Sequence, residues 1–239
     1  MTRPAVASTI NFDLEALNER FEMATPQQIL AWAVKNIPSG LVQSTSFSLL
    51  VITDMLYREL QPNPPVPVIF LDTLHHFSET LVTVERAKER YNLDVRTYRA
   101  LGVSSREEFA EVYGDALWEK DISRFHHVTK VEPLQRALNE TQAIAWITGR
   151  RREQSSTRQQ MPILERDHEG RLKINPLANW TRKDVWNYTL KHQVPYNRLH
   201  DQGYTSIGDE PLTTPVQAGE HERAGRWRGT VKTECGIHV

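Results

Sequence analysis

Short apolar runs alternate with helix-like segments along most of this 239-residue chain, and that alternation restricts the fold. The apolar runs predict strands, and the periodic segments between them predict helices. We expect strands at 40–43, 66–71, 94–98 and 143–148, and helices at 48–60, 77–91, 106–113 and 132–140. Strand–helix–strand connections of this kind build a parallel sheet with helices on both faces. The predicted fold class is therefore α/β, with a doubly wound, mostly parallel sheet.

Capping residues indicate where several helices begin. Asn11 is the expected N-cap of a helix that ends near Phe21, and Thr25, followed by proline, predicts a second helix. Ser105 is expected to cap a third helix, with Glu108 three residues later completing a capping box.

The chain divides into three predicted segments. Residues 1–38 form the N-terminal helices, and residues 39–194 form the α/β domain, which ends with a hairpin and a helix capped by Thr181. Residues 195–239 form a C-terminal tail dominated by glycine, proline and polar residues, which predicts loop structure. Loops of that length tend to be functional or mobile.

Polar residues follow several of the predicted strands at the point where each strand ends. They are Ser44–Ser46, Asp72-Thr73 and Gly149–Arg152. Ligands of parallel sheets bind beyond the carboxyl ends of the strands, so these residues predict a binding site. The hydroxyls and backbone N–H groups of Ser44–Ser46 fit a phosphate cradle, although a plain helix cap is the alternative.

The tail carries Cys235, the only cysteine of the chain. A lone cysteine forms neither an internal disulfide nor a four-thiolate zinc or iron–sulfur site. It is a buried filler, an incidental surface thiol or a nucleophile. Lys232 and His238 lie nearby, and cations favour the reactive thiolate, while Gly236 permits a close backbone approach to a ligand. These neighbours favour the nucleophile.

Charge and hydropathy exclude several classes of protein. The net charge of −1, from 29 basic and 30 acidic residues, gives no global indication of nucleic-acid binding. No apolar run approaches the roughly 18 residues of a membrane span, and residues 1–8 contain no signal-peptide core. We expect a cytoplasmic protein with a free thiol. Positive charge gathers locally in two clusters: Arg150, Arg151, Arg152 with Arg158, and Arg223, Arg226, Arg228 with Lys232.

The sequence around the cysteine, Lys-Thr-Glu-Cys-Gly-Ile-His at 232–238, resembles the C-terminal signature of the thioredoxin-dependent phosphoadenylyl-sulfate (PAPS) reductases. Further similar motifs cover the chain from about Thr25 to His238. They are Ser-Thr-Ser-Phe at 44–47, Asp-Thr at 72–73, Lys-Val-Glu-Pro at 130–133, Gly-Arg-Arg-Arg at 149–152 with Ser155 and Arg158, and Glu-Arg-Ala-Gly-Arg-Trp at 222–227.

This resemblance implies an adenine-nucleotide α-hydrolase-like sheet, with 39–194 as the nucleotide-binding domain and 195–239 as a flexible tail carrying the catalytic residue Cys235. The substrate-binding residues that it implies are Ser44, Thr45, Ser46, Asp72, Thr73, Lys130, Gly149, Arg151, Arg152, Arg158, Arg223, Arg226 and His238. Arginine suits this role because its planar fork binds phosphate or sulfate oxygens in bidentate fashion. His238 is expected to add to the positive charge.

The resemblance also implies a reaction. Cys235 attacks the sulfur of PAPS, adenosine 3′,5′-bisphosphate leaves, and thioredoxin or glutaredoxin releases sulfite from the cysteine adduct. No metal or iron–sulfur cluster is expected, because the cysteine set of the cluster-containing adenylyl-sulfate (APS) reductases is absent from the sequence. The cluster-free branch generally prefers PAPS, with APS as the alternative substrate. Relatives are homodimers.

Two other functions stay open. Adenylyl transfer or ATP pyrophosphate cleavage on the same fold would need a Ser-Gly-Gly-x-Asp-Ser loop, which Ser44–Phe47 does not match. A nucleotide-binding protein without catalytic activity is suggested by the loop after Phe47, where Ser48 replaces a glycine and the segment is about two residues short. The adjacent His75 and His76 suggest a metal site, but no carboxylate stands at metal spacing.

Overall fold

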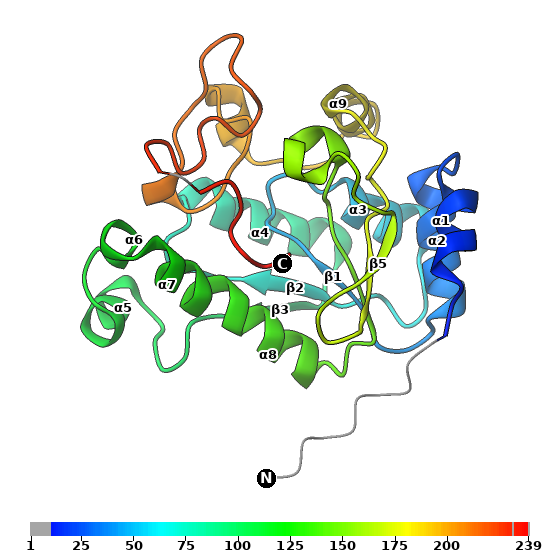
Figure 1. Cartoon of the computed structure of the whole chain (residues 1–239), viewed down its shortest axis with the longest axis horizontal. Coiled ribbons are helices and arrows are strands. Elements are labelled where there is room, and N and C mark those ends of the chain that lie inside the picture. The colour runs from blue at the N-terminus through cyan, green and yellow to red at the C-terminus, as the bar shows by residue number, and fades with distance from the viewer. Residues whose placement is uncertain (1–10, 231, 239) are drawn as a thin grey trace.

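The computed structural model describes residues 11–230 and 232–238, and a six-stranded sheet forms its centre (Figure 1). The strands are β1 (Leu41–Ser44), β2 (Val68–Leu71), β3 (Val95–Tyr98), β4 (Ala145–Ile147), β5 (Leu164–Arg166) and β6 (Leu172–Ile174). Their order is β3-β2-β1-β4-β6-β5; β5 pairs antiparallel with β6, and the other pairs are parallel. The predicted mostly parallel α/β sheet is confirmed.

Helices cover both faces of this sheet (Figure 1). They are α1 (Leu14–Phe21), α2 (Pro26–Asn36), α3 (Val51–Asp54), α4 (Ser78–Tyr91), α5 (Arg106–Tyr113), α6 (Leu117–Lys120), α7 (Ile122–His126), α8 (Glu132–Glu140) and α9 (Arg182–Lys191). Within the described residues, no helix combines the length and apolar character that crossing a membrane requires.

Alternate residues of each strand pack into two separate cores, one on each face of the sheet. On β2, Val68 and Phe70 join a large core that includes residues of α1, α2, α4 and α9. Ile69 points the other way and packs with Leu134 and Leu138 of α8. Because successive side chains of a strand alternate between faces, four apolar residues in a row serve two cores.

The connections reverse direction across the sheet between β1 and β4. From β1 the chain adds β2 and β3 on one side, and then returns to place β4 against the other side of β1. The loops that leave these two neighbouring strands therefore diverge, and a crevice opens between them at the carboxyl ends. The fold places its binding position here.

Of three predicted helix starts, one is wrong, one is confirmed and one is confirmed without its capping box. The first helix begins at Leu14, where the Asp13 carboxylate accepts a hydrogen bond from the N–H of Ala16, so Asn11 is not the cap. The cap at Thr25 is confirmed, with a full capping box. Ser105 accepts from the N–H of Glu108 as predicted, but the Glu108 carboxylate binds the N–H of the preceding Ser104 instead of closing the box.

The helix predicted at 48–60 is wrong at its start and in its type. Regular helix begins at Val51 and passes at Met55 into a π-helix that ends at Leu60. The preceding residues stay outside the helix, where a distant segment binds them. Ser48 bonds to His200, and Leu49 pairs with Tyr196 in an isolated β-bridge.

A second π-helix, His127–Val131, connects α7 to α8 and was not predicted. Its wide turn includes a hydrogen bond from the N–H of Glu132 to the carbonyl of His127, five residues earlier. Pro133 follows, and proline can neither donate to the ladder nor tolerate the carbonyl four residues before it. A π-turn accommodates that conflict and is frequent at functional sites. Lys130 lies within it.

The C-terminal segment contains little regular structure, as predicted. Two short 3₁₀ turns, Arg198–Gln202 and Glu210–Leu212, interrupt it, and isolated bridges join Thr213 to Arg226 and His76 to Asp209. The segment runs back over the sheet and ends beside it (Figure 1). At the other end, residues 1–10 of the predicted N-terminal segment lie outside the described part.

Several histidines are buried without charge. His126 is 1% exposed, and burial, helped by the nearby cation of Lys130, lowers its pKa to about 3. Burial likewise lowers the pKa of His200 to about 4. Both side chains still use a ring nitrogen: His126 accepts from the indole of Trp227 at 3.1 Å, and His200 bonds to Ser48 at 2.9 Å.

The packing of α8 on the sheet predicts a large cost for shortening its central side chain. Leu134 is 1% exposed and lies against Ile69, so Leu134→Ala should lower the free energy of unfolding by about 2–5 kcal/mol. Leu190→Ala is the matched control, because Leu190 is 65% exposed, and it should change stability by about 0.5 kcal/mol or less. Urea denaturation measures both; equal losses would contradict this account of the core.

The buried histidines predict that stability falls as the pH is lowered from 7 to 5. In the unfolded chain these histidines bind a proton near pH 6.5, whereas in the folded chain they stay neutral. Each of them therefore lowers the free energy of unfolding by up to about 1.4 kcal/mol per pH unit below that value. His126→Gln should make this slope shallower, whereas the same change at the exposed His168 should not. Denaturation curves at pH 7, 6 and 5 provide the measurement, and an unchanged slope for His126→Gln would refute the assignment.

Candidate active site

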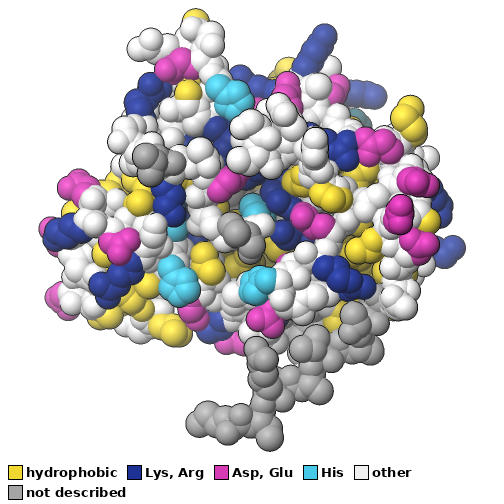
Figure 2. Space-filling view, in the orientation of Figure 1, with side chains coloured by type: hydrophobic (Ala, Val, Ile, Leu, Met, Phe, Trp, Pro, Cys, Tyr) yellow, Lys and Arg dark blue, Asp and Glu magenta, His cyan; other side chains and the backbone are white. Residues whose placement is uncertain are grey.

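A cavity of about 260 Å³ lies at the carboxyl ends of β1 and β4. Figure 2 shows Lys and Arg side chains around a hollow near the centre of this face. Among the residues that line the cavity are Ser44, Thr45, Ser46, Lys130, Gly149, Arg150, Arg151, Arg158, Arg223, Arg226, Cys235 and His238. The structure thus brings together most of the predicted site residues, from loops that are far apart in sequence.

The loop after β1 provides the hydroxyls. Thr45 Oγ1 accepts a hydrogen bond from the N–H of Phe47 at 3.3 Å, which tightens the turn. Phe47 itself is fully buried and has a φ of 52°, in the left-handed region that usually favours glycine. Its ring packs edge-on against Phe70, with centroids 5.2 Å apart. Phe47 thus makes a left-handed turn in this loop without glycine, and Ser44 and Ser46 lie at the cavity.

Two residues predicted at the end of β2 do not line the cavity. Asp72 turns away and accepts from Arg99 at 2.7 Å and from the N–H of Leu74 at 3.0 Å. Thr73 is buried, and its hydroxyl accepts from the N–H of His75. These hydrogen bonds form the tight turn, so the Asp72 and Thr73 side chains stabilise the loop and do not face the cavity. His76, which follows that turn, is the residue that reaches the cavity.

Lys130 is held by a buried carboxylate. Its ammonium contacts Asp209, a residue with no exposed surface. Burial alone would raise the pKa of Asp209, but the Lys130 ammonium outweighs it and holds that pKa well below the ordinary range. The ion pair fixes the Lys130 ammonium at the cavity wall, on the π-helix described above, while Asp209 balances its charge.

The arginines after β4 diverge. Arg151 lines the cavity and binds Glu222 through two contacts of 2.7 Å, while Arg152 points outward and pairs with Glu22 at 2.5 Å. Arg151 has an extended backbone, and neighbouring side chains of extended chain point in opposite directions. The expectation that Arg152 lies at the site is therefore wrong; it connects this loop to the end of α1.

The substrate-binding set implied by the resemblance omits Arg150, although the predicted site at Gly149–Arg152 includes it, and Lys173 was missed. Arg150 lines the cavity and contacts Glu165, and burial, with the nearby Arg158, lowers its pKa to about 10. Lys173 of β6 contributes positive charge nearby, with its ammonium 5.2 Å from the ring centre of Trp146, and burial lowers its pKa to about 8. The position of Arg150, three residues after the last residue of β4, was the available signal for the first.

Arg223 and Arg226 stack on one indole. Their guanidinium carbons lie 5.2 and 4.5 Å from the ring centre of Trp227. Arg226 donates to Ser206 and to the carbonyl of Ile207. A Cβ at Gly208 would lie 2.1 Å from Nη2 of Arg226, so this position requires glycine. Burial and the neighbouring arginines lower the pKa of Arg223 to about 10, which leaves it charged at neutral pH.

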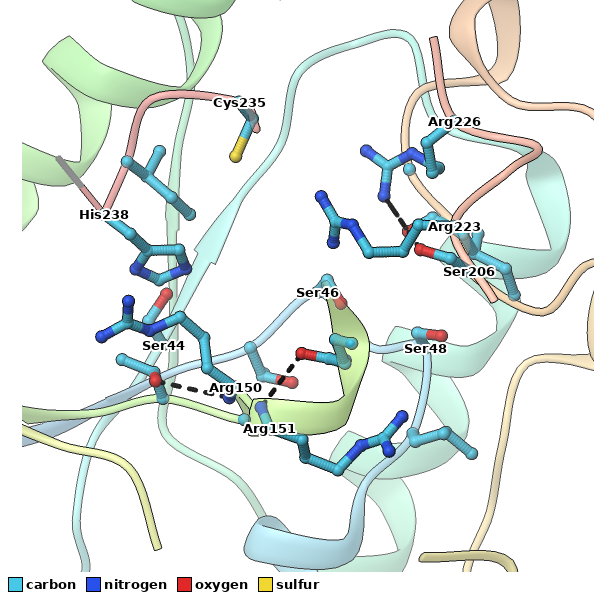
Figure 3. A pocket seen from close by; sticks show the side chains of 18 of the residues that line it. Ser44, Ser46, Ser48, Arg150, Arg151, Ser206, Arg223, Arg226, Cys235 and His238 are labelled. Atoms are coloured by element: carbon cyan, nitrogen blue, oxygen red, sulfur yellow. Dashed lines mark hydrogen bonds between the residues drawn. The ribbon is translucent and has the colours of Figure 1, made fainter. Parts of the chain in front are cut away.

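Cys235 and His238 complete the cavity from the tail. Cys235 is half-buried, and Figure 3 shows its sulfur pointing into the space between His238 and the two tail arginines. The His238 ring is stacked on Trp146, with centroids 5.8 Å apart and an interplanar angle of 8°. Burial and the cations around it, first among them Arg150, hold the pKa of His238 well below its usual range. In the protein alone these groups favour the neutral imidazole, and positive charge on His238 beside a bound substrate stays a prediction.

Comparison with known proteins identifies the family. The model of the phosphoadenosine phosphosulfate reductase domain matches residues 40–215, which include the sheet and both loops that flank the crevice. A phosphoadenosine phosphosulfate reductase of Emericella nidulans is 48% identical over 94% of this chain and 74% of its own length. The corresponding protein of Saccharomyces cerevisiae is 46% identical over 94% of this chain and 89% of its own length. An adenosine 5′-phosphosulfate reductase of Halalkalibacterium halodurans is 41% identical over 96% of this chain and 98% of its own length.

Solved structures agree with the fold. The crystal structure of PAPS reductase from Candida auris, a phosphate complex, has a TM-score of 0.77 and 40% identity, and covers 87% of this chain and all of that one. An FMN adenylyltransferase of Candida glabrata has a TM-score of 0.60 at 16% identity, covering 92% of this chain and 77% of its own, and shares the fold alone. Family model, sequence relatives and structure agree: this chain belongs to the phosphoadenosine phosphosulfate reductase family, whose members are oxidoreductases that act on sulfur.

Proposed function

We propose that this chain reduces PAPS to sulfite and adenosine 3′,5′-bisphosphate in assimilatory sulfate reduction. At the coarser level supported by the family, it is a PAPS or APS reductase. The observation that carries the proposal is the position of Cys235, the sole cysteine, at a cavity walled by lysine and arginine. A thiol and a set of fixed cations are what sulfuryl transfer to a cysteine requires.

In the first step, the Cys235 thiolate attacks the sulfate sulfur of the nucleotide. An S–S bond forms, the bond between that sulfur and the bridging oxygen breaks, and the electron pair leaves with adenosine 3′,5′-bisphosphate. The enzyme then carries a Cys–S–SO₃⁻ adduct. Negative charge grows on the leaving phosphate, and Lys130, Arg223 and Arg226 line the space where it would develop.

His238 takes a different part from these cations. Because its imidazole is neutral, it carries one N–H, which can donate a hydrogen bond to an oxygen of the transferring group. Burial, together with the nearby charges of Arg150 and Lys173, favours that form by lowering the pKa of the ring. A bound polyanion would oppose these cations and favour protonation of the ring.

The second step needs two electrons from outside the chain. A thiolate of a dithiol protein attacks the Cys235 sulfur, sulfite leaves with the electron pair of the S–S bond, and the second thiol of that protein resolves the mixed disulfide. Since the chain has one cysteine, it cannot supply the second thiol. Thioredoxin or glutaredoxin is the proposed reductant. A cytoplasmic location suits a free thiol, and the family resemblance supports a homodimer.

The choice between PAPS and APS rests on the relatives. The fungal proteins at 46–48% identity are named for PAPS, and the bacterial proteins at 40–42% are named for APS. This difference favours PAPS. The adenylyl-transfer alternative is supported only by a likeness of fold, and it leaves Cys235 without a role.

Assay of sulfite release tests both the reaction and the cysteine. The protein should form sulfite with thioredoxin, with a higher kcat/KM for PAPS than for APS. Cys235→Ser should abolish sulfite formation and leave the affinity for adenosine 3′,5′-bisphosphate within about tenfold, or about 1.4 kcal/mol, because the thiol lies on the tail. Full activity of the serine variant would end the mechanism, and nucleotide binding without any sulfite from the unaltered protein would favour the non-catalytic alternative.

The cofactor proposal has its own test. Within residues 11–230 and 232–238, one group of possible metal ligands, Asp54, Glu59 and His192, has its atoms within 4.8 Å of one another. Arg58 already contacts two of these residues, Asp54 at 3.0 Å and His192 at 2.6 Å, so a cation occupies that cluster.

The purified protein should therefore be colourless and should keep its activity after dialysis against chelator, because a single thiolate cannot build a cluster. Absorption spectra and the sulfite assay before and after dialysis provide the measurement. A visible charge-transfer band, or activity that is lost to chelator and restored by a metal, would overturn the proposal.

A further inference from the structure

Glu234, the residue before the cysteine, is bound by two arginines of the site. Arg158 donates to its carboxylate through Nε at 2.8 Å and Nη2 at 2.6 Å, and Arg223 adds a contact at 3.2 Å. The hydroxyls of Ser155 and Thr157 lie 3.4 Å away. Burial would raise the pKa of Glu234, but these arginines outweigh it and lower that pKa, so the carboxylate is charged.

Arg158 uses three of its five N–H groups on partners within the chain. Its remaining terminal nitrogen, Nη1, donates to Gln154 at 2.6 Å, so each nitrogen of this guanidinium has a partner within the chain. Gln154 in turn accepts from the backbone N–H of Arg151, which fixes it in place. Arg158 is 7% exposed. Its contacts are those of a residue that holds the tail.

Arg223 is placed differently. Its contacts to the tail, with the Glu234 carboxylate and the carbonyl of Thr233, both use Nη2. Among the described residues, no hydrogen bond engages its Nε or Nη1, and the side chain lines the cavity. An anion in the cavity can therefore draw on Arg223 while Arg158 keeps the carboxylate.

Cys235 is thus held from two sides. Glu234 fixes the chain before it through the ion pair, and Ile237 and His238 fix the chain after it, against the apolar cluster of α8 and against Trp146. Gly236, with a φ of 88°, makes the turn between these attachments. The thiol therefore lies on a short turn of the chain, and the residues before and after it are bound to different parts of the cavity wall.

We propose that Glu234 is a positioning residue: its ion pair with Arg158 fixes the tail so that the Cys235 sulfur faces the substrate. The chemistry in this statement rests on the proposed function, whereas the placement rests on the contacts alone. Arg158, which the family resemblance assigns to substrate binding, holds the tail in this proposal. The ion pair fixes the position of a segment that has almost no helix or strand to do so.

Glu234→Gln tests this, because glutamine keeps the size of the side chain and removes its charge. Tail amides between 232 and 238 should exchange hydrogen faster, as seen by mass spectrometry, and kcat for sulfite formation should fall about 10–100-fold, since misplacement of a nucleophile by about 1 Å has effects of that size. The affinity for adenosine 3′,5′-bisphosphate, measured by calorimetry, should stay within about twofold. Glu220→Gln is the matched control: it breaks an exposed pair with Arg228 at 2.8 Å and should change none of these.

Charge reversal gives a second arm. Glu234→Arg should lose more activity than Glu234→Gln, and adding Arg158→Glu should recover part of that loss. Unchanged exchange and kcat in Glu234→Gln would overturn the proposal, as would a loss of nucleotide affinity equal to the loss of kcat/KM, which would place Glu234 in substrate binding. If the unaltered protein forms no sulfite, the proposed function fails, and the exchange measurement still decides whether Glu234 holds the tail.

Discussion

Buried ion pairs hold the C-terminal segment of this protein onto its sheet. The positive groups at the carboxyl ends of the strands are mostly removed from solvent, and burying an unpaired charge is costly. Lys130, Arg151 and Arg158 therefore each need a carboxylate. The segment after residue 195 supplies one to each of them, through Asp209, Glu222 and Glu234. A segment with little helix or strand is in this way given a defined path over the site.

The same pairing decides which cations remain available for a substrate. Arg150 and Arg151 are matched by Glu165 and Glu222, so their charge is largely balanced within the protein. Arg226 has neutral oxygens as hydrogen-bond partners, and its Nε has none among the described residues. An arginine buried in that condition is predisposed to bind an anion. The cavity thus contains arginines that are paired with carboxylates and maintain its shape. It also contains Arg226 of the C-terminal segment, whose hydrogen-bond partners are uncharged.

Much of this arrangement could be predicted from local sequence. The apolar periodicity found the strands of the sheet, and the rule that ligands bind where parallel strands end pointed to Ser44 and Gly149. What local sequence could not provide was the direction of side chains on irregular backbone. Asp72 and Arg152 follow strands, as binding residues should, yet both turn away. The carboxylate partners were also beyond reach, since Asp209 lies 79 residues from Lys130 and Glu222 lies 71 from Arg151.

Trp227 connects more of the site than its single position suggests. Its ring supports Arg223 and Arg226, and its N–H binds His126, which lies 3.9 Å from Asp209, the partner of Lys130. Arg223, Arg226 and Lys130, which come from two parts of the chain, thus all depend on the position of one indole ring. Displacement of that indole would therefore disturb the surroundings of all three cations. Substitutions that adapt the cavity to a differently charged ligand would therefore be expected away from Trp227 and its three cations. The loop after β1, which carries the hydroxyl groups, is one such place.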